Sequence, residues 1–170
     1  DLTVTASRFV AAGETIIGTG FSSACGGKGA NQAVQAARLG AEVTMVGRVG
    51  NDPFGRTLID CAQKDGIDVS HISVSAAQPT GCANIQIASC PEKTENRIVI
   101  IPGANMDISA REVEFLKRDI KNYDMVLLQF EIPMEINRLV AGYAYSEGVP
   151  VMLNCAPYAP VPAELLSALT

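Results

Sequence analysis

The sequence predicts an α/β fold, in which helices cover both faces of a parallel sheet and a smaller β-layer stands beside it. After residue 28, segments with helical periodicity alternate with short, continuously apolar segments. This rhythm is typical of parallel strands that are buried between two helix layers. The segments before residue 25 and between residues 80 and 101 are β-like but partly polar, so they do not fit that sheet. They predict the separate β-layer.

The β-layer is expected to contain strands rich in Thr, Val and Ile that turn residues separate. They are Leu2–Phe9, Thr15–Ser23, Thr80–Ser89 and Asn96–Ile101. In the third of them Ala83, Ile85 and Ile87 alternate with more polar positions, which predicts one apolar face.

Local start and stop signals set the helices of the α/β part. Asp52 and Pro53 form an N-cap and a first helical residue, and Ser109 with Glu112 forms a capping box. The predicted helices are Ala30–Leu39, Pro53 to near Gly66, one from Ser109, Pro133 to Gly148, and Pro162–Leu169. The predicted strands between them are 42–47, His71–Val74, Met125–Phe130 and Val149–Leu153.

Composition excludes several classes of protein. The net charge of −5 and the absence of any basic run argue against a nucleic-acid partner or an anionic membrane surface. No apolar stretch is long enough to span a bilayer. The five cysteines are odd in number and lack a C-x-x-C spacing, so we expect reduced thiols in a cytoplasm and neither a disulfide framework nor a metal site.

A glycine cluster stands directly before the first predicted helix. Gly26 and Gly27 let the backbone approach a ligand closely, and the helix behind them presents free N–H groups. Lys28 adds donors, and Asn31 adds an amide that both donates and accepts. This set suits a polyhydroxyl compound or an oxyanion, but the residues around it match neither a Walker A loop nor a dinucleotide fingerprint. A tight turn with a solvated lysine is the alternative.

Glu131 is the second candidate, because it follows an apolar strand at the carboxyl edge of the predicted sheet, where open α/β folds bind ligands. A carboxylate that merely favours the start of the next helix is the alternative. Asp1 precedes the first strand and taken alone is an exposed end residue.

The segment "CGGKGANQAVQAARLGAEVTMVGRVGNDPFG" closely resembles the N-terminal signature of the ribokinase family of carbohydrate kinases, also called the phosphofructokinase-B family. Further matches follow in the expected order and span nearly all of the chain: "TGCANIQI", "IVIIPGAN", "LLQFEIP" and "LNCAP". The resemblance implies a three-layer α/β/α sheet with a small β-sheet lid, incomplete in this chain. It assigns residues 1–24 and 80–101 to the lid, and residues 25–79 and 102–170 to the N-terminal half of the kinase body.

The resemblance also implies an activity, the ATP-dependent phosphorylation of D-ribose at its primary hydroxyl to give ribose 5-phosphate, with Mg²⁺ and K⁺. The sugar site would take Gly26, Gly27, Lys28, Asn31 and Asp1, with Glu131 on a ribose hydroxyl. Ala83, Ile85 and Ile100 would form an apolar wall in the lid, and a homodimer would form through the lid.

The family's catalytic aspartate lies in a Gly-Ala-Gly-Asp motif, which does not occur in these 170 residues. We therefore expect no catalytic residue here, the nucleotide and cation sites outside this chain, and an inactive isolated chain. A deoxyribose or nucleoside kinase, or a non-catalytic sugar-binding protein, are the alternatives. Because the chain begins at Asp1 without a methionine, its true N-terminus is expected to lie outside the sequence.

Overall fold

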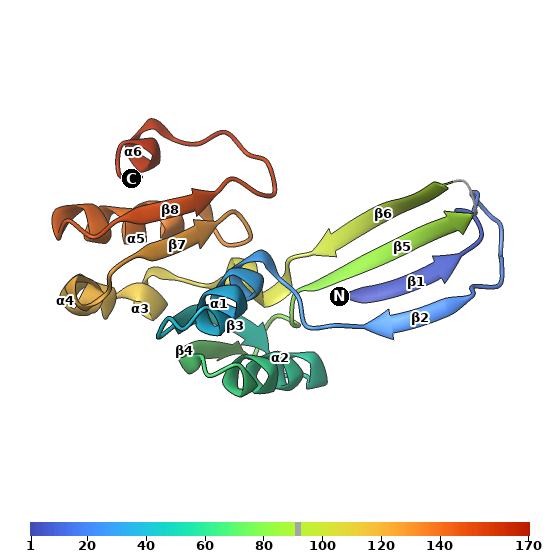
Figure 1. Ribbon diagram of the computed structural model, residues 1–170, viewed down its shortest axis with the longest axis horizontal. Helices are drawn as coiled ribbons and strands as arrows, with labels where there is room; N and C mark the ends of the chain where they lie inside the picture. Colours follow the sequence, from blue (N-terminus) through green and yellow to red (C-terminus); the bar gives the residue numbers. More distant parts are fainter. Residues whose placement is uncertain (91–92) are drawn as a thin grey trace.

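A computed structural model describes residues 1–90 and 93–170 of the chain, and Figure 1 shows a four-stranded sheet that stands off a body of helices and further strands. This sheet has the order β2-β1-β5-β6. Its strands are β1 (Leu2–Ala6), β2 (Gly20–Ser23), β5 (Cys82–Cys90) and β6 (Lys93–Ile101). Strand β1 runs parallel to β5 and antiparallel to β2, and β5 runs antiparallel to β6.

The register of the four-stranded sheet divides its side chains between two faces. Ile85 pairs with Thr3 on one side and with Ile98 on the other, and Ala83 pairs with Ile100. Because successive residues of a strand point to opposite faces, these five side chains share one face. We call it the inner face. The outer face carries Val4, Phe21, Gln86, Arg97 and Val99.

The loop of residues 7–19 folds over part of the outer face. The guanidinium of Arg97 lies 4.0 Å from the centre of the Phe9 ring, a cation–π contact. A hollow of about 300 Å³ lies between this loop and the sheet, lined by Val4 and Gln86 among others. The loop therefore covers part of the outer face and leaves the inner face for other contacts.

Two pairs of parallel strands form the sheet part of the body. Strand β3 (Thr44–Gly50) pairs with β4 (Asp68–Ser75), and β7 (Val126–Gln129) pairs with β8 (Val151–Asn154). The main helices around them are α1 (Lys28–Arg38), α2 (Pro53–Lys64) and α5 (Met134–Ser146). The shorter ones are α3 (Ala110–Val113), α4 (Leu116–Asp119), α6 (Ala163–Leu166) and the 3₁₀ turns η1 (Gly103–Asp107) and η2 (Ile120–Asn122). The predicted α/β fold class is confirmed.

The body contains two apolar clusters. The larger one joins α5 to β7 and β8 and includes Val140, Ala141, Leu128 and Val151. The smaller one packs α1 against α2 through Ala33 and Ala62, with Ile67 beneath them. Together with the contacts of α1 with β3 and β7, this cluster fixes α1 on the body.

The predicted helix caps are confirmed. The Asp52 carboxylate accepts a hydrogen bond of 2.9 Å from the Gly55 backbone N–H at the start of α2. Ser109 and Glu112 form the capping box of α3.

A network of hydrogen bonds joins the four-stranded sheet to the body. Asp52 also accepts bonds of 2.7 Å from both the backbone N–H and the hydroxyl of Thr80, which comes just before β5. The Thr80 hydroxyl oxygen in turn accepts a bond of 2.9 Å from the Gly50 backbone N–H. These charge-assisted bonds to the backbone hold the pKa of the Asp52 carboxyl below its usual range. The same aspartate thus caps α2 and anchors the chain where it leaves the body for the sheet.

Two expected strands are shorter than predicted. Strand β1 ends at Ala6 instead of Phe9, and β2 begins at Gly20 instead of Thr15. Between them Glu14 holds the connecting loop, since its carboxylate pairs with Arg8 and accepts a bond of 3.0 Å from the Ala11 backbone N–H. These side-chain bonds replace the ladder that extended strands would have made.

The expectation that the cysteines are all reduced is wrong for one pair. Cys25 and Cys61 form a disulfide, although they lie 36 residues apart in the sequence. Cys82 and Cys155 have free thiols. The pairing arises because Cys25, three residues before α1, lies beside Cys61 in the third turn of α2. Within the residues that the structure describes, no helix combines the length and the apolar character needed to cross a membrane.

Candidate functional site

The candidate site is built around the start of α1. Residues 24–28, which we call the glycine loop, lead from β2 into this helix. Gly27 is the N-cap residue and has a φ of 97°, in the left-handed region that favours glycine. No side chain of the loop itself caps the helix, so its first N–H groups must find acceptors elsewhere.

Glu131 supplies one of those acceptors from a distant part of the chain. Its Oε2 atom accepts a hydrogen bond of 2.6 Å from the backbone N–H of Lys28. A carboxylate at this position is favoured both by the hydrogen bond and by the positive end of the helix dipole. The sequence-predicted residues Gly27, Lys28 and Glu131 therefore lie together.

Two residues that the sequence analysis did not single out hold Glu131 in place. The side-chain Oε1 of Gln129 accepts a bond of 2.7 Å from the Glu131 backbone N–H. The fully buried Asn137, on α5, donates a bond of 2.7 Å from Nδ2 to the Gln129 carbonyl. The available signal was the polar glutamine at the end of an apolar strand. Nothing in the sequence marks Asn137 as its partner.

Gly29 lets α1 pack against this pair. A Cβ atom on Gly29 would lie 3.0 Å from Nε2 of Gln129. Glycine at this position therefore lets the helix lie close to β7 without displacing the end of the Gln129 side chain.

Asp1 reaches the glycine loop from the four-stranded sheet. Its backbone nitrogen donates to the Ala24 carbonyl at 2.9 Å, and the Ala24 N–H donates to the Asp1 carbonyl at 3.1 Å. A Cβ atom on Gly26 would lie 2.5 Å from an Asp1 carboxylate oxygen, so the absence of a side chain there admits the carboxylate. Asp1 and Glu131 thus place carboxylates on the same short loop.

The remaining predicted residues occupy two different places. Asn31 lies in the first turn of α1, where its backbone N–H donates to the Gly27 carbonyl at 2.9 Å and its side chain is exposed. Ala83, Ile85 and Ile100 share the inner face of the four-stranded sheet. No hydrogen bond or core cluster of the described residues joins these three to the glycine loop. That any of the nine residues binds a sugar stays a prediction.

The glycine loop does not fit the phosphates of a nucleotide. Phosphate groups bind at helix N-termini through free N–H groups. Here the Glu131 carboxylate occupies the first of them, and Asp1 adds a second carboxylate beside it. Across residues 1–90 and 93–170, no cluster of three or more His, Cys, Asp and Glu side chains could hold a metal ion. We therefore derive no step through a nucleotide or a metal at this site.

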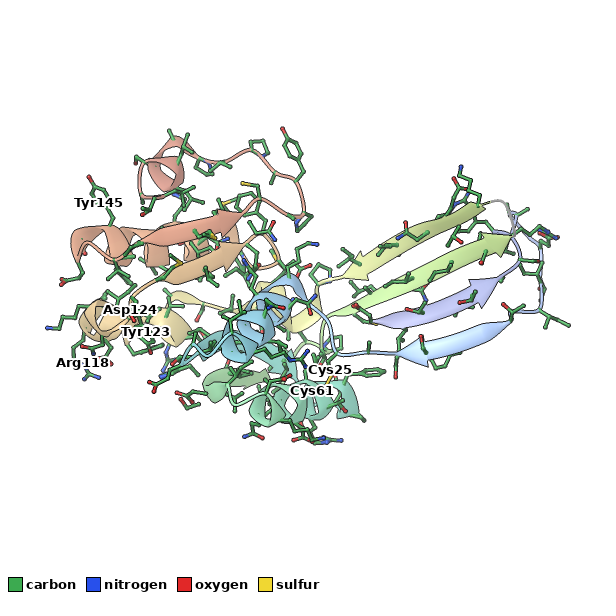
Figure 2. All side chains as sticks on the ribbon, viewed as in Figure 1. Cys25, Cys61, Arg118, Tyr123, Asp124 and Tyr145 are labelled. Carbon is green, nitrogen blue, oxygen red and sulfur yellow. A yellow bond between two sulfur atoms is a disulfide. The ribbon has the colours of Figure 1, made fainter. Side chains whose placement is uncertain are left out.

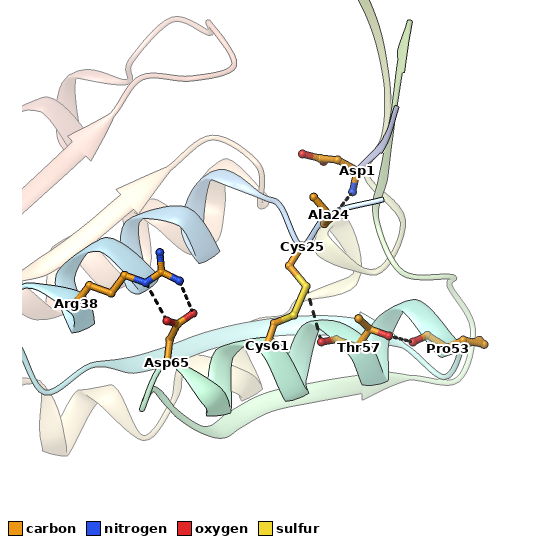
Figure 3. Close-up of a disulfide and its surroundings, with 8 residues drawn as sticks. All are labelled: Asp1, Ala24, Cys25, Arg38, Pro53, Thr57, Cys61 and Asp65. Carbon is orange, nitrogen blue, oxygen red and sulfur yellow. Dashed lines mark hydrogen bonds and ion pairs between the residues drawn. A yellow bond between two sulfur atoms is a disulfide. The ribbon is translucent and has the colours of Figure 1, made fainter. Parts of the chain in front are cut away.

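Figure 2 places the disulfide at the junction of the body with the four-stranded sheet, while Arg118, Tyr123 and Asp124 lie at the opposite end of the body. The candidate residues around the glycine loop share this junction, because Cys25 directly precedes Gly26. Figure 3 shows the bond from the Asp1 nitrogen to the Ala24 carbonyl at the start of the loop, and the Cys25–Cys61 bond next to it.

Comparisons with known proteins identify the family of this chain. The ribokinase of Bacillus subtilis strain 168 is 40% identical over 170 residues, which is all of this chain and 57% of that protein. The deoxyribokinase of Salmonella typhi is 32% identical over 157 residues, 92% of this chain and 50% of that protein. The chain thus spans about half the length of these curated relatives.

A solved structure of Arabidopsis thaliana ribokinase complexed with ribose and ATP superposes with a TM-score of 0.86 and 34% identity. The match covers 99% of this chain and 54% of that one. The family model for the pfkB family carbohydrate kinases matches residues 1–170. Because the family match covers its full length, the chain belongs to the pfkB family of carbohydrate kinases.

Proposed function

We propose that this chain is the sugar-binding half of an ATP-dependent ribokinase, which phosphorylates D-ribose at its primary hydroxyl to give ribose 5-phosphate. The observation that carries the proposal is the bond between Glu131 and the Lys28 backbone, which fixes one oxygen of the carboxylate on the glycine loop and leaves the other for a ligand. The 40% identity to a ribokinase supports ribose as the sugar.

Each polar residue has a role that suits a pentose. Glu131 and Asp1 accept hydrogen bonds from hydroxyl groups, and the exposed amide of Asn31 both donates and accepts. The Lys28 side chain donates beside them. The exposed backbone of Gly27 lets the sugar ring lie against the loop without meeting a Cβ atom, and Gly26 leaves room for the Asp1 carboxylate beside it.

We further propose that the four-stranded sheet is a lid over the sugar. Residues 1–24 and 80–101 would form it, and residues 25–79 and 102–170 would form the body. Ala83, Ile85 and Ile100 would pack on the apolar face of the sugar, since the loop of residues 7–19 lies over part of the outer face and leaves the inner one for a ligand.

A homodimer through the lid is proposed as well. Strand β6 is an edge strand, and its residues are exposed. On the outer face Phe21 is 71% and Val99 is 62% exposed, which is apolar area that a second copy could cover. We also propose a cytoplasmic location, in keeping with the two free thiols.

The chemical step is proposed to depend on residues outside this chain. The Gly-Ala-Gly-Asp motif is absent from the sequence, and the glycine loop does not fit phosphates. We therefore place the catalytic base, ATP, Mg²⁺ and K⁺ in the part of the relatives that this chain does not match.

Deoxyribose is the second candidate substrate, because the Salmonella typhi deoxyribokinase is 32% identical. A nucleoside, or sugar binding without catalysis, are the further alternatives. Ribose and 2-deoxyribose differ only in the 2-hydroxyl, so discrimination requires a protein partner for that group, and Asp1 and Asn31 are the candidates.

The test is an assay of ADP release with ATP, Mg²⁺ and K⁺, in which ribose, 2-deoxyribose and adenosine are compared. It uses both the 170-residue chain and a longer polypeptide that contains it. We expect ribose to give the highest kcat/KM with the longer polypeptide, and no turnover with the chain alone. A higher kcat/KM with 2-deoxyribose or adenosine would overturn the proposed substrate. Turnover by the chain alone would overturn the proposal that the chemical step depends on residues outside it.

A further inference from the structure

The disulfide between Cys25 and Cys61 lies directly beside the proposed sugar site. Cys25 immediately precedes Gly26, and Cys61 is on α2, which contributes no residue to the site. The bond therefore ties the glycine loop to a helix that would otherwise contact it only weakly. The Cys25 sulfur has one further polar neighbour, the Thr57 carbonyl on α2 at 3.9 Å (Figure 3).

The contacts on α1 differ between its two ends. At its C-terminal end Arg38 forms an ion pair with Asp65 of 2.9 Å, and in its middle Ala33 packs on Ala62. Neither contact involves the glycine loop. Loss of the disulfide would leave the helix packed on α2 and would release only the residues that precede it.

The loop has three other attachments, and all of them are hydrogen bonds. Asp1 and Ala24 exchange two bonds at its start, and Glu131 binds the Lys28 N–H at its end. Both neighbouring carboxylates are proposed ligands of the sugar. The disulfide is thus the one covalent cross-link of the loop among the described residues. The Asp1–Ala24 bonds join backbone groups, and the Glu131 bond uses a carboxylate that is also proposed to bind the sugar.

We propose that the Cys25–Cys61 disulfide is a reversible redox switch that sets the sugar affinity of the glycine loop. In the oxidised state the loop is held in the conformation that binds, so less ordering is required when the sugar arrives. In the reduced state the loop samples more conformations, and the sugar binds more weakly. This inference rests on the proposed function, because the loop must be part of the sugar site.

The switch operates by thiol–disulfide exchange with a small disulfide such as oxidised glutathione. The exposed Cys25, as a thiolate, attacks one sulfur of that disulfide and releases one thiolate. The Cys61 thiolate then attacks the Cys25 sulfur of the mixed disulfide and releases the second thiolate. The protein loses two electrons and two protons, and the small disulfide gains them as two thiols. Cytosolic disulfides, where they occur, are most often of this transient or sensing kind.

The experiment equilibrates the longer polypeptide in buffers of oxidised and reduced glutathione and quantifies the Cys25–Cys61 bond by differential alkylation and peptide mass mapping. The KM for ribose is measured at each setting. We expect the bond to open in reducing buffer and the KM to rise about fivefold, with kcat unchanged. A bond that stays intact in every buffer, or a KM independent of its state, would overturn the proposal.

Three cysteine variants test whether the Cys25–Cys61 bond causes the change in KM. Cys25→Ser and Cys61→Ser should each show the high KM of the reduced protein in all buffers, and Cys155→Ser should keep the wild-type response. A low KM in Cys61→Ser would refute the role of the bond.

Hydrogen exchange of the peptide that covers residues 24–31 gives a readout that needs no sugar. It should be faster in the reduced form, and equal exchange in both forms would overturn the proposal. If exchange responds to the redox state while ribose is not turned over, the proposed function fails and the disulfide's control of the loop stands.

Discussion

The carboxylate of Glu131 accepts a hydrogen bond of 2.6 Å from the backbone N–H of Lys28, 103 residues earlier in the chain. One side chain therefore caps the helix behind the glycine loop and offers its second oxygen beside that loop. Helix capping and ligand binding are combined in a single residue, and its removal should affect both.

We predict that Glu131→Ala lowers the free energy of unfolding by about 1–3 kcal/mol, because it leaves the Lys28 N–H without its charged acceptor. In the longer polypeptide it should also raise the KM for ribose by at least about tenfold, a loss of about 1.4 kcal/mol of binding. Urea titration and steady-state kinetics measure the two effects. The control is Glu135→Ala, at an exposed position of α5, and an equal effect of both substitutions would contradict the assignment.

Gly27 and Gly40 form a matched pair on either side of α1. Their φ angles are 97° and 96°, so a Cβ atom strains the backbone at both, by about 1–3 kcal/mol. We predict that Gly27→Ala and Gly40→Ala both destabilise the fold, but that only Gly27→Ala weakens ribose binding. Thermal unfolding and calorimetric titration with ribose test this. Similar ribose affinities in the two variants would show that Gly27 is not part of the sugar site.

Asp52 makes the fold sensitive to acid. Its pKa is lowered in the folded state by bonds from the Thr80 backbone, the Gly55 backbone and the Thr80 hydroxyl. The ionised carboxylate therefore stabilises the fold fully above its unfolded pKa of about 4, and this contribution is lost as the pH falls toward the lower folded value.

The variant Asp52→Asn should accordingly be less stable than the wild type at pH 7, and the difference should shrink as the pH is lowered below about 4. Urea unfolding at a series of pH values measures this. Asp60→Asn, at an exposed position of the same helix, should leave the profile unchanged. A difference for Asp52→Asn that stays constant with pH would show that its charge is not involved.

Val99 and Ile100 are neighbours on β6 that point to opposite faces of the sheet. They are 62% and 49% exposed, so a polar substitution at either one costs little core packing. We predict that Ile100→Ser raises the KM for ribose with no change in assembly, and that Val99→Ser weakens the dimer with little change in KM. Analytical ultracentrifugation and kinetics separate the two. The reverse pattern would exchange the roles of the two faces.

Features that rest on local chemistry were predictable from the sequence. The Asp52–Pro53 start of α2 and the Ser109–Glu112 capping box follow from side chains within three residues of the backbone groups that they bind. The apolar alternation around Ile85 likewise follows from the strand period of two. In each case the deciding contact is short in sequence.

Contacts between distant segments were not predictable from the residues alone. The bond of Asp52 to Thr80 spans 28 residues, and the disulfide from Cys25 spans 36. Neither pair has a sequence signature, because each depends on how separate elements pack together. The early end of β1 has a more local cause, since Glu14 folds back on Arg8, six residues earlier, and takes the chain out of the ladder.

The long separation between Lys28 and Glu131 also sets the order in which a ribosome can complete this region. Cys25 and Cys61 emerge early, and the 36 residues between them close a smaller loop than the 103 that separate Lys28 from Glu131. The larger closure costs about 1 kcal/mol more in chain entropy. During synthesis the first N–H of α1 therefore has no carboxylate acceptor until β7 and Glu131 have been made.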